Sequence, residues 1–209
     1  MLFRYSLFFI LLCKSLSPNA SAAENKNAYS KDFLEGDELS SEGPDLSGSL
    51  DLKGFTALGI QIISSTLDDV LKVSPNSKIH AGNLSSYVCL ESQDGTTVKF
   101  SSGIMRLKTN AITLIEVFRK QEKLSFRSKC SKTHKEFKGV TFLNGLSLSS
   151  NKKSILKRLK KPSSMSPRLI GYHYSSPETD TGAETISGVE FLFIGEIVVK
   201  ITLYSITSN

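Results

Sequence analysis

The most constraining feature of this sequence is an internal repeat, because a repeat predicts two similar structural units. Residues 53–75 read KGFTALGIQIISSTLDDVLKVSP, and residues 138–162 read KGVTFLNGLSLSSNKKSILKRLKKP. Each segment begins with Lys-Gly, continues to a Gly followed by alternating apolar residues, and then has Ser-Ser, a helix-like piece and a Pro. Self-similarity at one offset, here about 85 residues, is typical of duplicated units. The sequence therefore predicts two tandem units, residues 50–127 and residues 128–209.

Each unit is predicted to contain a short strand, a helix and a three-stranded antiparallel meander. The meander begins with an aromatic-containing strand, at Tyr87 in the first unit and at Tyr172 in the second. Its later strands read TTVKF and AITLIEVFR, and then GVEFLF and EIVVKITLYSI. These runs are rich in Val, Ile, Thr, Phe and Tyr with partial alternation, which is typical of strands. The predicted fold class is α+β: two tandem strand-helix-meander repeats, with an antiparallel sheet and short helices packed on one face.

The helices are predicted from their caps and from the spacing of their apolar residues. Ser65 or Thr66 caps the first helix, and Asn151 caps the second. Apolar residues fall on one side of each helix: Leu67, Val70 and Leu71 in the first, and Ile155, Leu156 and Leu159 in the second. Pro162 ends the second helix. At roughly ten residues neither helix is stable alone in water, so each must pack on the sheet.

The N-terminus has the pattern of a secretory signal peptide. A positively charged start precedes the apolar run 7–12, and Ala-Ser-Ala at residues 20–22 fits an A-x-A cleavage site. A membrane anchor needs about 20 apolar residues, and this run is about half as long. Residues 1–22 are therefore predicted to be a signal peptide, and the mature protein to be periplasmic or secreted. Lipid anchoring at Cys13 is disfavoured, because Leu12 precedes it where a lipobox has a small residue.

Two of the three cysteines, Cys89 and Cys130, remain in the mature chain. An even pair in an exported protein favours a disulfide between them. A metal site is the alternative, but it would need further ligands at close spacing. The three histidines are scattered along the sequence: His80, His134 and His173. We therefore predict a disulfide, no metal and no cofactor.

Charge divides the mature chain into two parts. Residues 23–49 hold seven acidic residues against Lys26 and Lys31, and such a segment is typical of a flexible leader. In the rest of the mature chain Lys and Arg outnumber Asp and Glu. The opposite charges suggest the hypothesis that the leader lies across the basic surface and screens it. A plain flexible leader is the alternative.

Residues 151–162, NKKSILKRLKKP, contain six basic side chains and no acidic one. These candidates for an anionic-partner surface are Lys152, Lys153, Lys157, Arg158, Lys160 and Lys161. Further cations follow from the stretch between the repeats: Arg119, Lys120, Lys123, Arg127, Lys129, Lys132 and Lys135. The helix is either an ordinary solvated face or a surface for an anionic envelope partner, such as lipid headgroups, lipopolysaccharide or an acidic protein. No nucleic acid is expected, because the helix lacks the interleaved aromatic residues of a stacking platform.

Catalytic motifs are absent from the sequence: there is no Gly-x-Ser-x-Gly elbow, no phosphate-cradling glycine loop and no His-Glu-x-x-His. His134 lies in a charged loop and is expected to be solvated. His173 alternates with Tyr172 and Tyr174, so the tyrosines share one face of a strand and His173 has the other. Either the tyrosines pack in the core and His173 is an exposed strand residue, or the strand belongs to a contact surface. The candidate sheet-face contacts are Tyr87, Tyr172, His173 and Tyr174.

The repeated pattern resembles a known family. The motifs are Gly59-Ile60-Gln61-Ile62 with Leu67-Asp68-Asp69-Val70-Leu71, and Gly145-Leu146-Ser147-Leu148 with Ser154-Ile155-Leu156-Lys157. Tandem units of this kind resemble the secreted beta-lactamase-inhibitory proteins, and a single unit is similar to the small outer-membrane assembly lipoproteins of the BamE type. The resemblance covers about residues 53–206. It implies a curved antiparallel sheet with helices on one face and a concave face that holds a partner protein.

The sequence departs from this family pattern after the second strand of each motif. Ile63 and Ser149 stand where members commonly have Gly, so the turn into the helix is expected to differ. No position matches a defined binding residue of the family, and partner contacts are therefore not carried over.

Together these features predict an exported, non-catalytic protein-binding or envelope-assembly module that uses a sheet face and a basic helix surface. The expected partner is an envelope or secreted protein with an acidic surface, or an anionic membrane surface. Two alternatives stay open. One is an inhibitor of a secreted or periplasmic enzyme, which the tandem architecture permits, and the other is a small hydrolase with an unrecognised site.

Overall fold

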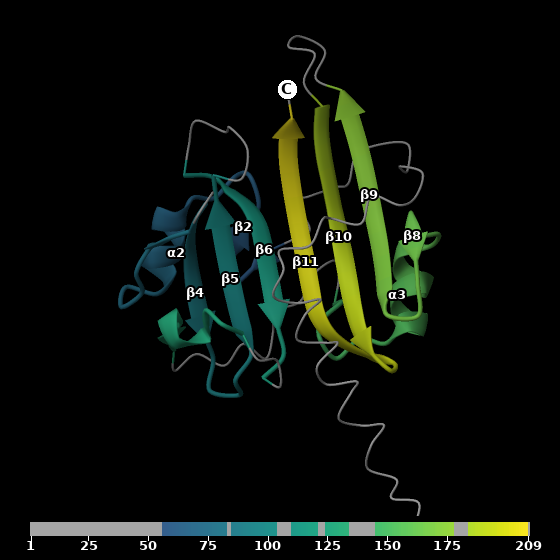
Figure 1. Ribbon diagram of the computed structural model, residues 1–209, viewed down its shortest axis with the longest axis horizontal. Coiled ribbons are helices and arrows are strands. Elements are labelled where there is room, and N and C mark those ends of the chain that lie inside the picture. The colour runs from purple at the N-terminus through teal and green to yellow at the C-terminus, as the bar shows by residue number, and fades with distance from the viewer. Residues whose placement is uncertain are drawn as a thin grey trace, which may run out of the picture. The chain divides into compact units, whose positions relative to one another are not determined.

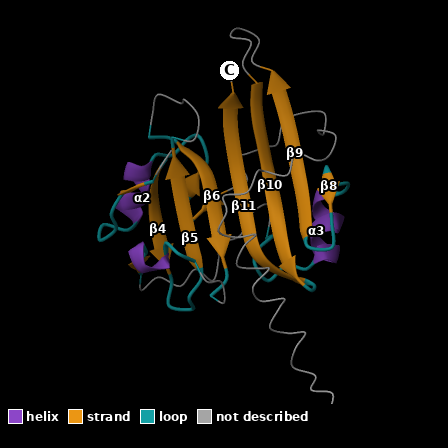
Figure 2. Cartoon of the chain, in the orientation of Figure 1, coloured by secondary structure: helices purple, strands orange, loops and turns teal. Residues whose placement is uncertain are grey.

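A nine-stranded sheet organises the part of the chain that the structure describes (Figure 1). The computed structural model describes residues 56–82, 85–103, 110–120, 124–133, 145–177 and 184–208. All of them belong to one compact unit, residues 38–209. The sheet is antiparallel except for one short parallel pair, and helices accompany it (Figure 2). The α+β class predicted from the sequence is confirmed.

Two groups of strands make up the sheet. The first half contains β3 (His80–Ala81), β4 (Ser86–Glu91), β5 (Thr97–Ser102) and β6 (Ile112–Phe118). The second half contains β8 (Ser164–Met165), β9 (Leu169–Pro177), β10 (Glu184–Ile194) and β11 (Ile197–Ser208). The order across the sheet is β3-β4-β5-β6-β11-β10-β9-β8, and β7 (Ser131–Lys132) pairs in parallel with β4. The halves are joined edge to edge, because β6 pairs with β11.

One face of the sheet forms the hydrophobic core. Successive side chains of a strand point to opposite faces, and a row of buried residues crosses the sheet from strand to strand: Val88, Phe100, Ile115, Leu203, Val189 and Tyr172. The helices α2 (Leu67–Val73) and α3 (Lys152–Leu159) pack on this face. Leu67 and Val70 of α2 and Ile155 of α3 are completely buried there. We call this the helix face and the opposite side the far face.

The start of each helix is tied to the last strand of its own half. Thr66, the N-cap of α2, forms an antiparallel bridge with Ala111 just before β6. Asn151, the N-cap of α3, forms an antiparallel bridge with Ile197 at the start of β11. The capping side chain therefore sets where the helix begins, and the bridge sets where the helix lies on the sheet.

A small hairpin precedes α2. Its strands β1 (Thr56–Ala57) and β2 (Ile60–Gln61) form a separate two-stranded sheet. Ile63 follows with a φ of +66°, in the left-handed region that disfavours β-branched residues. Its N–H donates to the Ile112 carbonyl at 2.7 Å. The turn into α2 therefore places Ile63 in a backbone conformation that favours Gly.

Candidate functional site

The helix α3 begins after Asn151, which caps it as predicted. The Asn151 Oδ1 accepts the backbone N–H of Ser154 at 2.9 Å, and the Ser154 Oγ accepts the backbone N–H of Asn151 at 3.2 Å. This reciprocal pair satisfies two donors that a helix N-terminus otherwise leaves free. Ile155 is buried, and Leu156 and Leu159 pack against the core. The apolar stripe of α3 therefore faces the sheet.

The other side of α3 and the turn after it carry exposed cations. We call this set the basic face: Lys153, Lys157, Arg158, Lys160 and Lys161. Among the described residues, no carboxylate forms an ion pair with these five side chains. A cluster of unpaired cations attracts anionic partners and speeds association with them. The basic face is therefore the candidate site.

Lys152 differs from the five cations of the basic face, although the sequence grouped it with them. Its side chain is half-buried, and its Nζ lies 5.2 Å from the ring centroid of Phe193. The same Nζ donates to the carbonyl of Pro167. A cation held over an aromatic ring is stabilised there. Lys152 therefore holds α3 to β10 and to the loop before β9.

The helix α3 ends at a residue with unusual backbone geometry. Lys160 has a φ of +64° and a ψ of −134°, a region that residues other than Gly rarely occupy. Its carbonyl accepts the hydroxyl of Tyr172 at 3.2 Å. Burial raises the pKa of Tyr172 to about 12, so this hydroxyl stays protonated and remains a donor. The end of α3 is thus tied to β9.

The charges of α2 are arranged differently. Asp68 and Asp69 lie in its first turn and Lys72 in its last. Lys72 Nζ lies 2.8 Å from Asp69 Oδ1. The hydrogen bond from Lys72, followed by those from Thr66, lowers the pKa of Asp69 to about 2. The charges of α2 therefore pair with one another, whereas those of α3 do not.

The far face buries a carboxylate between two lysines. Glu116 on β6 has its Oε2 3.0 Å from Lys99 Nζ and its Oε1 2.8 Å from Lys200 Nζ. Burial raises the pKa of this carboxyl, but the positive charges of Lys200 and Lys99 act more strongly in the opposite direction. The pKa of Glu116 is consequently lowered. The ionised carboxylate links the first half of the sheet to β11 of the second half.

A second carboxyl group lies further along the same row of the far face. Thr202 pairs with Glu116 on one side and with Glu190 on the other. The Glu190 Oε1 lies 3.9 Å from the His173 Nε2 and accepts no hydrogen bond within the described part of the chain. Burial raises the pKa of Glu190, and the charge of Lys200 offsets this only in part.

His173 is buried on the far face, so the prediction that it is an exposed strand residue is wrong. Its Nδ1 is hydrogen-bonded to the hydroxyl of Tyr204, and its Nε2 lies 3.3 Å from the Ser164 Oγ. Gly188 pairs with both His173 and Tyr204. A Cβ at Gly188 would lie 2.4 Å from the Tyr204 hydroxyl. The absence of a side chain at Gly188 therefore lets the two rings meet across the sheet.

The four candidate sheet-face contacts do not form one surface. Tyr172 is buried in the core on the helix face, and Tyr174 is half-buried against the same core. Tyr87 is buried on the far face, where its ring stacks on His80 at a centroid distance of 5.3 Å. His173 is buried there as well. Alternation along the strands divides the set between two faces, so these residues do not present a common contact surface.

Residues 124–133, which we call the covering segment, lie against the first half of the sheet. They include the short 3-10 helix η2 (Arg127–Lys129) and β7. A disulfide joins Cys130 to Cys89 on β4, which confirms the predicted pair. The ring of Phe126 packs edge-on against Phe118 with a centroid distance of 5.5 Å. The covering segment is thus fixed by a covalent bond and by aromatic packing.

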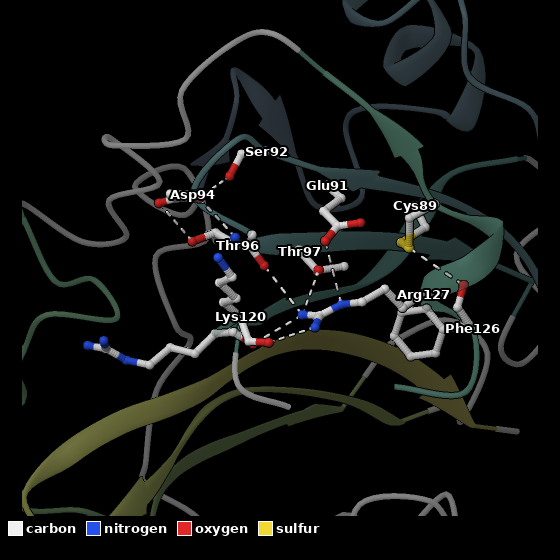
Figure 3. A network of polar contacts seen from close by, with 12 residues as sticks. Cys89, Glu91, Ser92, Asp94, Thr96, Thr97, Lys120, Phe126 and Arg127 are labelled. Atoms are coloured by element: carbon white, nitrogen blue, oxygen red, sulfur yellow. Dashed lines mark hydrogen bonds and ion pairs between the residues drawn. A yellow bond between two sulfur atoms is a disulfide. The ribbon is translucent and has the colours of Figure 1, made fainter. Parts of the chain in front are cut away.

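Figure 3 shows how Arg127 of the covering segment reaches the neighbouring turns. Its Nη1 donates to the Lys120 carbonyl at 2.6 Å, and its Nη2 donates to the Gly95 carbonyl and to the Thr97 Oγ1, each at 3.3 Å. Its Nε lies 3.8 Å from the Glu91 Oε1. The guanidinium group therefore holds the covering segment to β4 and β5 and is not available to a partner.

Arg119 has a structural role too, so the cations predicted between residues 119 and 135 do not all have the same role. Its Nε donates to the Val198 carbonyl at 2.7 Å, and its guanidinium also donates to the Leu148 carbonyl. Lys120, Lys129 and Lys132 are exposed.

Several predicted features lie outside the described residues: Lys123, His134, Lys135, Cys13, the signal peptide (1–22) and the acidic leader (23–49).

The sequence did not indicate the roles of Glu116 and Arg127. The sequence did contain a signal for Glu116, since it is a single acid inside the apolar run AITLIEVF. A carboxylate buried in such a strand needs cationic partners. Nothing in the local sequence distinguishes Arg127 from the cations around it. Its role comes from turns that are distant along the chain.

The described ranges contain neither a membrane-spanning helix nor a metal cluster. No helix there is long and apolar enough to cross a bilayer. In the same residues no group of three or more His, Cys, Asp or Glu side chains is placed to bind a metal ion. No protein-family model, curated protein or solved structure matches this chain.

Proposed function

We propose that this chain is an exported, non-catalytic binding module of the cell envelope that binds an anionic partner through the basic face of α3. The observation that carries this proposal is the set of five exposed cations without a carboxylate partner among the described residues. The comparison with α2 supports it, because α2 packs on the same face of the sheet with acidic residues in its first turn. The fold therefore does not require the lysines of α3.

Glu116 and Arg127 are both engaged by contacts within the fold, which supports a structural role over catalysis for these two residues. A catalytic acid or base must come within hydrogen-bonding distance of its substrate. Glu116 is instead enclosed by Lys99 and Lys200, and Arg127 is occupied by backbone carbonyls and Glu91. These groups join elements of the fold to one another.

Export is supported by the disulfide and by the signal-like N-terminus. Disulfides persist in the periplasm and outside the cell and are rare in the reducing cytosol. Cys89 and Cys130 form such a bond. The predicted signal peptide provides a route to the same compartments.

The arrangement of the sheet supports two related units. Across the sheet, β3-β4-β5-β6 is followed by the strands of the second half in reverse sequence order, β11-β10-β9-β8. In each half the N-cap of the helix bridges to the beginning of the last meander strand, as Thr66 does with Ala111 and Asn151 with Ile197. This agreement favours the tandem repeat and the resemblance to beta-lactamase-inhibitory and BamE-type proteins. It also favours the second candidate function, inhibition of a secreted or periplasmic enzyme.

The test is retention of the purified protein on washed envelope material at low salt. The variant with Lys153→Gln, Lys157→Gln and Lys161→Gln removes three charges while keeping good helix formers. The matched control is Lys78→Gln, Lys129→Gln and Lys132→Gln, which removes three exposed charges elsewhere. We expect the wild type and the control to be retained and the α3 variant to be released. Raising the salt concentration should release all three, because exposed charges are screened.

Equal retention of the two variants would overturn the basic face as the binding site. Mass spectrometry of the material held by the wild type separates the candidate functions. A single enzyme recovered in stoichiometric amount would favour inhibition, and envelope-assembly components would favour the first proposal.

A further inference from the structure

Three large apolar side chains of the second half are exposed: two flank the turn between β10 and β11, and one ends β8. Met165 at the end of β8 is 67% exposed, and Ile197 at the start of β11 is 54% exposed. Ile194, the partner of Ile197 across the hairpin, is 42% exposed. Large apolar side chains are normally withdrawn from water, and a group of exposed ones is typical of an interaction site.

Hydrogen bonds bring these residues and α3 to the same end. The N–H of Phe193, next to Ile194, donates to the Arg168 carbonyl at 2.8 Å, so the hairpin meets the loop that follows Met165. Lys152 of α3 donates to the Pro167 carbonyl in the same loop. Asn151 bridges to Ile197. In Figure 1 the turn between β10 and β11 accordingly lies next to the lower end of α3.

The chemistry of this end is typical of attachment to an anionic bilayer. Apolar side chains enter the boundary between headgroups and acyl chains, while nearby Lys and Arg side chains attract anionic headgroups. The isoleucines flank a two-residue turn, Gly195 and Glu196, and Met165 belongs to a separate strand. A fluid bilayer accepts apolar groups at separate points, whereas a protein partner needs a shaped pocket for each of them.

We propose that this end of the second half docks on an anionic lipid surface, with Ile194, Ile197 and Met165 entering the headgroup region and the basic face contacting lipid phosphates. The inference rests on the proposed function, because it names the anionic partner as a bilayer. Glu196 opposes the attraction, since its carboxylate lies in the hairpin turn between the two isoleucines. Docking accordingly brings that carboxylate close to the lipid phosphates.

The experiment uses vesicles made of equal parts phosphatidylglycerol and phosphatidylcholine, with vesicles of phosphatidylcholine alone as the comparison. The purified protein is sedimented with each at low salt. We expect binding only to the anionic vesicles. Lys153→Gln with Lys157→Gln should weaken binding roughly fivefold for each charge removed. Ile194→Ser with Ile197→Ser should weaken it roughly tenfold or more, and Glu196→Gln should strengthen it severalfold.

The matched control is Lys78→Gln with Ile79→Ser, which changes an exposed cation and an Ile of similar exposure, 41%, in the first half. It should bind as the wild type does. The chain contains no Trp, so Ile197→Trp provides a fluorescence reporter at the hairpin. Its emission should shift to shorter wavelength with anionic vesicles, and that of Ile79→Trp should not.

Three results would overturn the lipid inference. The first is full binding by the Ile194→Ser, Ile197→Ser variant, and the second is an unshifted emission of Ile197→Trp on bound vesicles. The third is failure to bind any vesicle while envelope material still retains the protein through the basic face. That last result would leave the proposed function standing, with an acidic protein or lipopolysaccharide as the partner.

Discussion

The far face buries a carboxyl group in each half of the sheet, and the pKa values of the two shift in opposite directions. Glu116 contacts two ammonium groups, and its pKa is lowered. Glu190 has the imidazole of His173 at 3.9 Å and the charge of Lys200 nearby, and its pKa is raised. Both residues pair with Thr202 in the same row of the sheet. The number of close cations, and not the position in the sheet, therefore decides whether the pKa of the buried acid is lowered or raised.

The halves also differ in how their far faces are held. The covering segment is tied to the first half through Cys89 and Cys130, through Phe126 and through Arg127. In the second half, His173 and Tyr204 are hydrogen-bonded to each other over Gly188. One half is closed by a covalent bond and the other by side-chain packing. We therefore expect substitutions in the two halves to change the free energy of unfolding by different amounts.

The largest effect is expected from removing the covalent closure. Cys89→Ala with Cys130→Ala opens a link between residues separated by 41 positions, and the free energy of unfolding should fall by about 4 kcal/mol. Urea unfolding followed by circular dichroism measures this. A reductant should destabilise the wild type by a similar amount and leave the double variant unchanged. A double variant as stable as the wild type would show that the covering segment is held mainly by packing.

The next effect concerns Glu116. Glu116→Gln leaves Lys99 and Lys200 facing each other without the carboxylate, and we expect a loss of about 3 kcal/mol at pH 7. A lowered pKa in the folded state adds stability above the unfolded pKa, and this contribution is lost as pH falls through the folded pKa. The difference from the wild type should therefore shrink below about pH 4.5. Glu196→Gln, at an exposed turn residue, is the control and should change stability little.

Glu190→Gln should act in the opposite direction. A raised pKa in the folded state means that folding favours the protonated acid, so the wild type loses stability as pH rises above the unfolded pKa. The variant has no charge to bury and should be more stable than the wild type by about 1 to 2 kcal/mol at pH 8. The two proteins should be nearly equal at pH 4. Urea unfolding at both pH values tests this, and a destabilised variant at pH 8 would contradict the unfavourable burial of Glu190.

The smallest effect is expected at the turn into α2. Ile63→Asn replaces a β-branched residue at a φ of +66° with a residue that tolerates this region, and should raise the free energy of unfolding by about 1 kcal/mol. Ile79→Asn is the matched control, because Ile79 is similarly exposed and has no positive φ. Thermal unfolding should rank Ile63→Asn above the wild type and Ile79→Asn near it. If Ile79→Asn unfolded at a higher temperature than Ile63→Asn, the added stability would come from removing an exposed apolar group and not from the backbone conformation of residue 63.

Much of the fold could be predicted because its signals are local. The caps Thr66 and Asn151 start the helices where the sequence indicates, and the spacing of Ile155, Leu156 and Leu159 predicts which side of α3 faces the core. The even number of cysteines in the predicted mature chain, which follows a signal-like start, predicts the disulfide. Each of these inferences depends on a few neighbouring residues or on a simple count.

The candidate site was predictable in part for the same reason. The sequence alone determined that α3 carries cations opposite its apolar stripe, because helical periodicity separates the two sides of a helix. It did not distinguish Lys152, which packs over Phe193, from the exposed members of the basic face. It also did not place Asn151, at the start of α3, next to the exposed Ile197.

Only the tertiary structure decided what lies on each side of the strands. Alternation shows that Tyr172 and His173 point in opposite directions, but not that both directions lead to buried surroundings. The contacts that bury His173 come from Ser164, Gly188 and Tyr204, and those that hold Glu116 come from Lys99 and Lys200. These partners lie on different strands and are far apart along the chain. Local sequence rules describe neighbours along the chain, whereas the burial and charge of a side chain depend on neighbours in space.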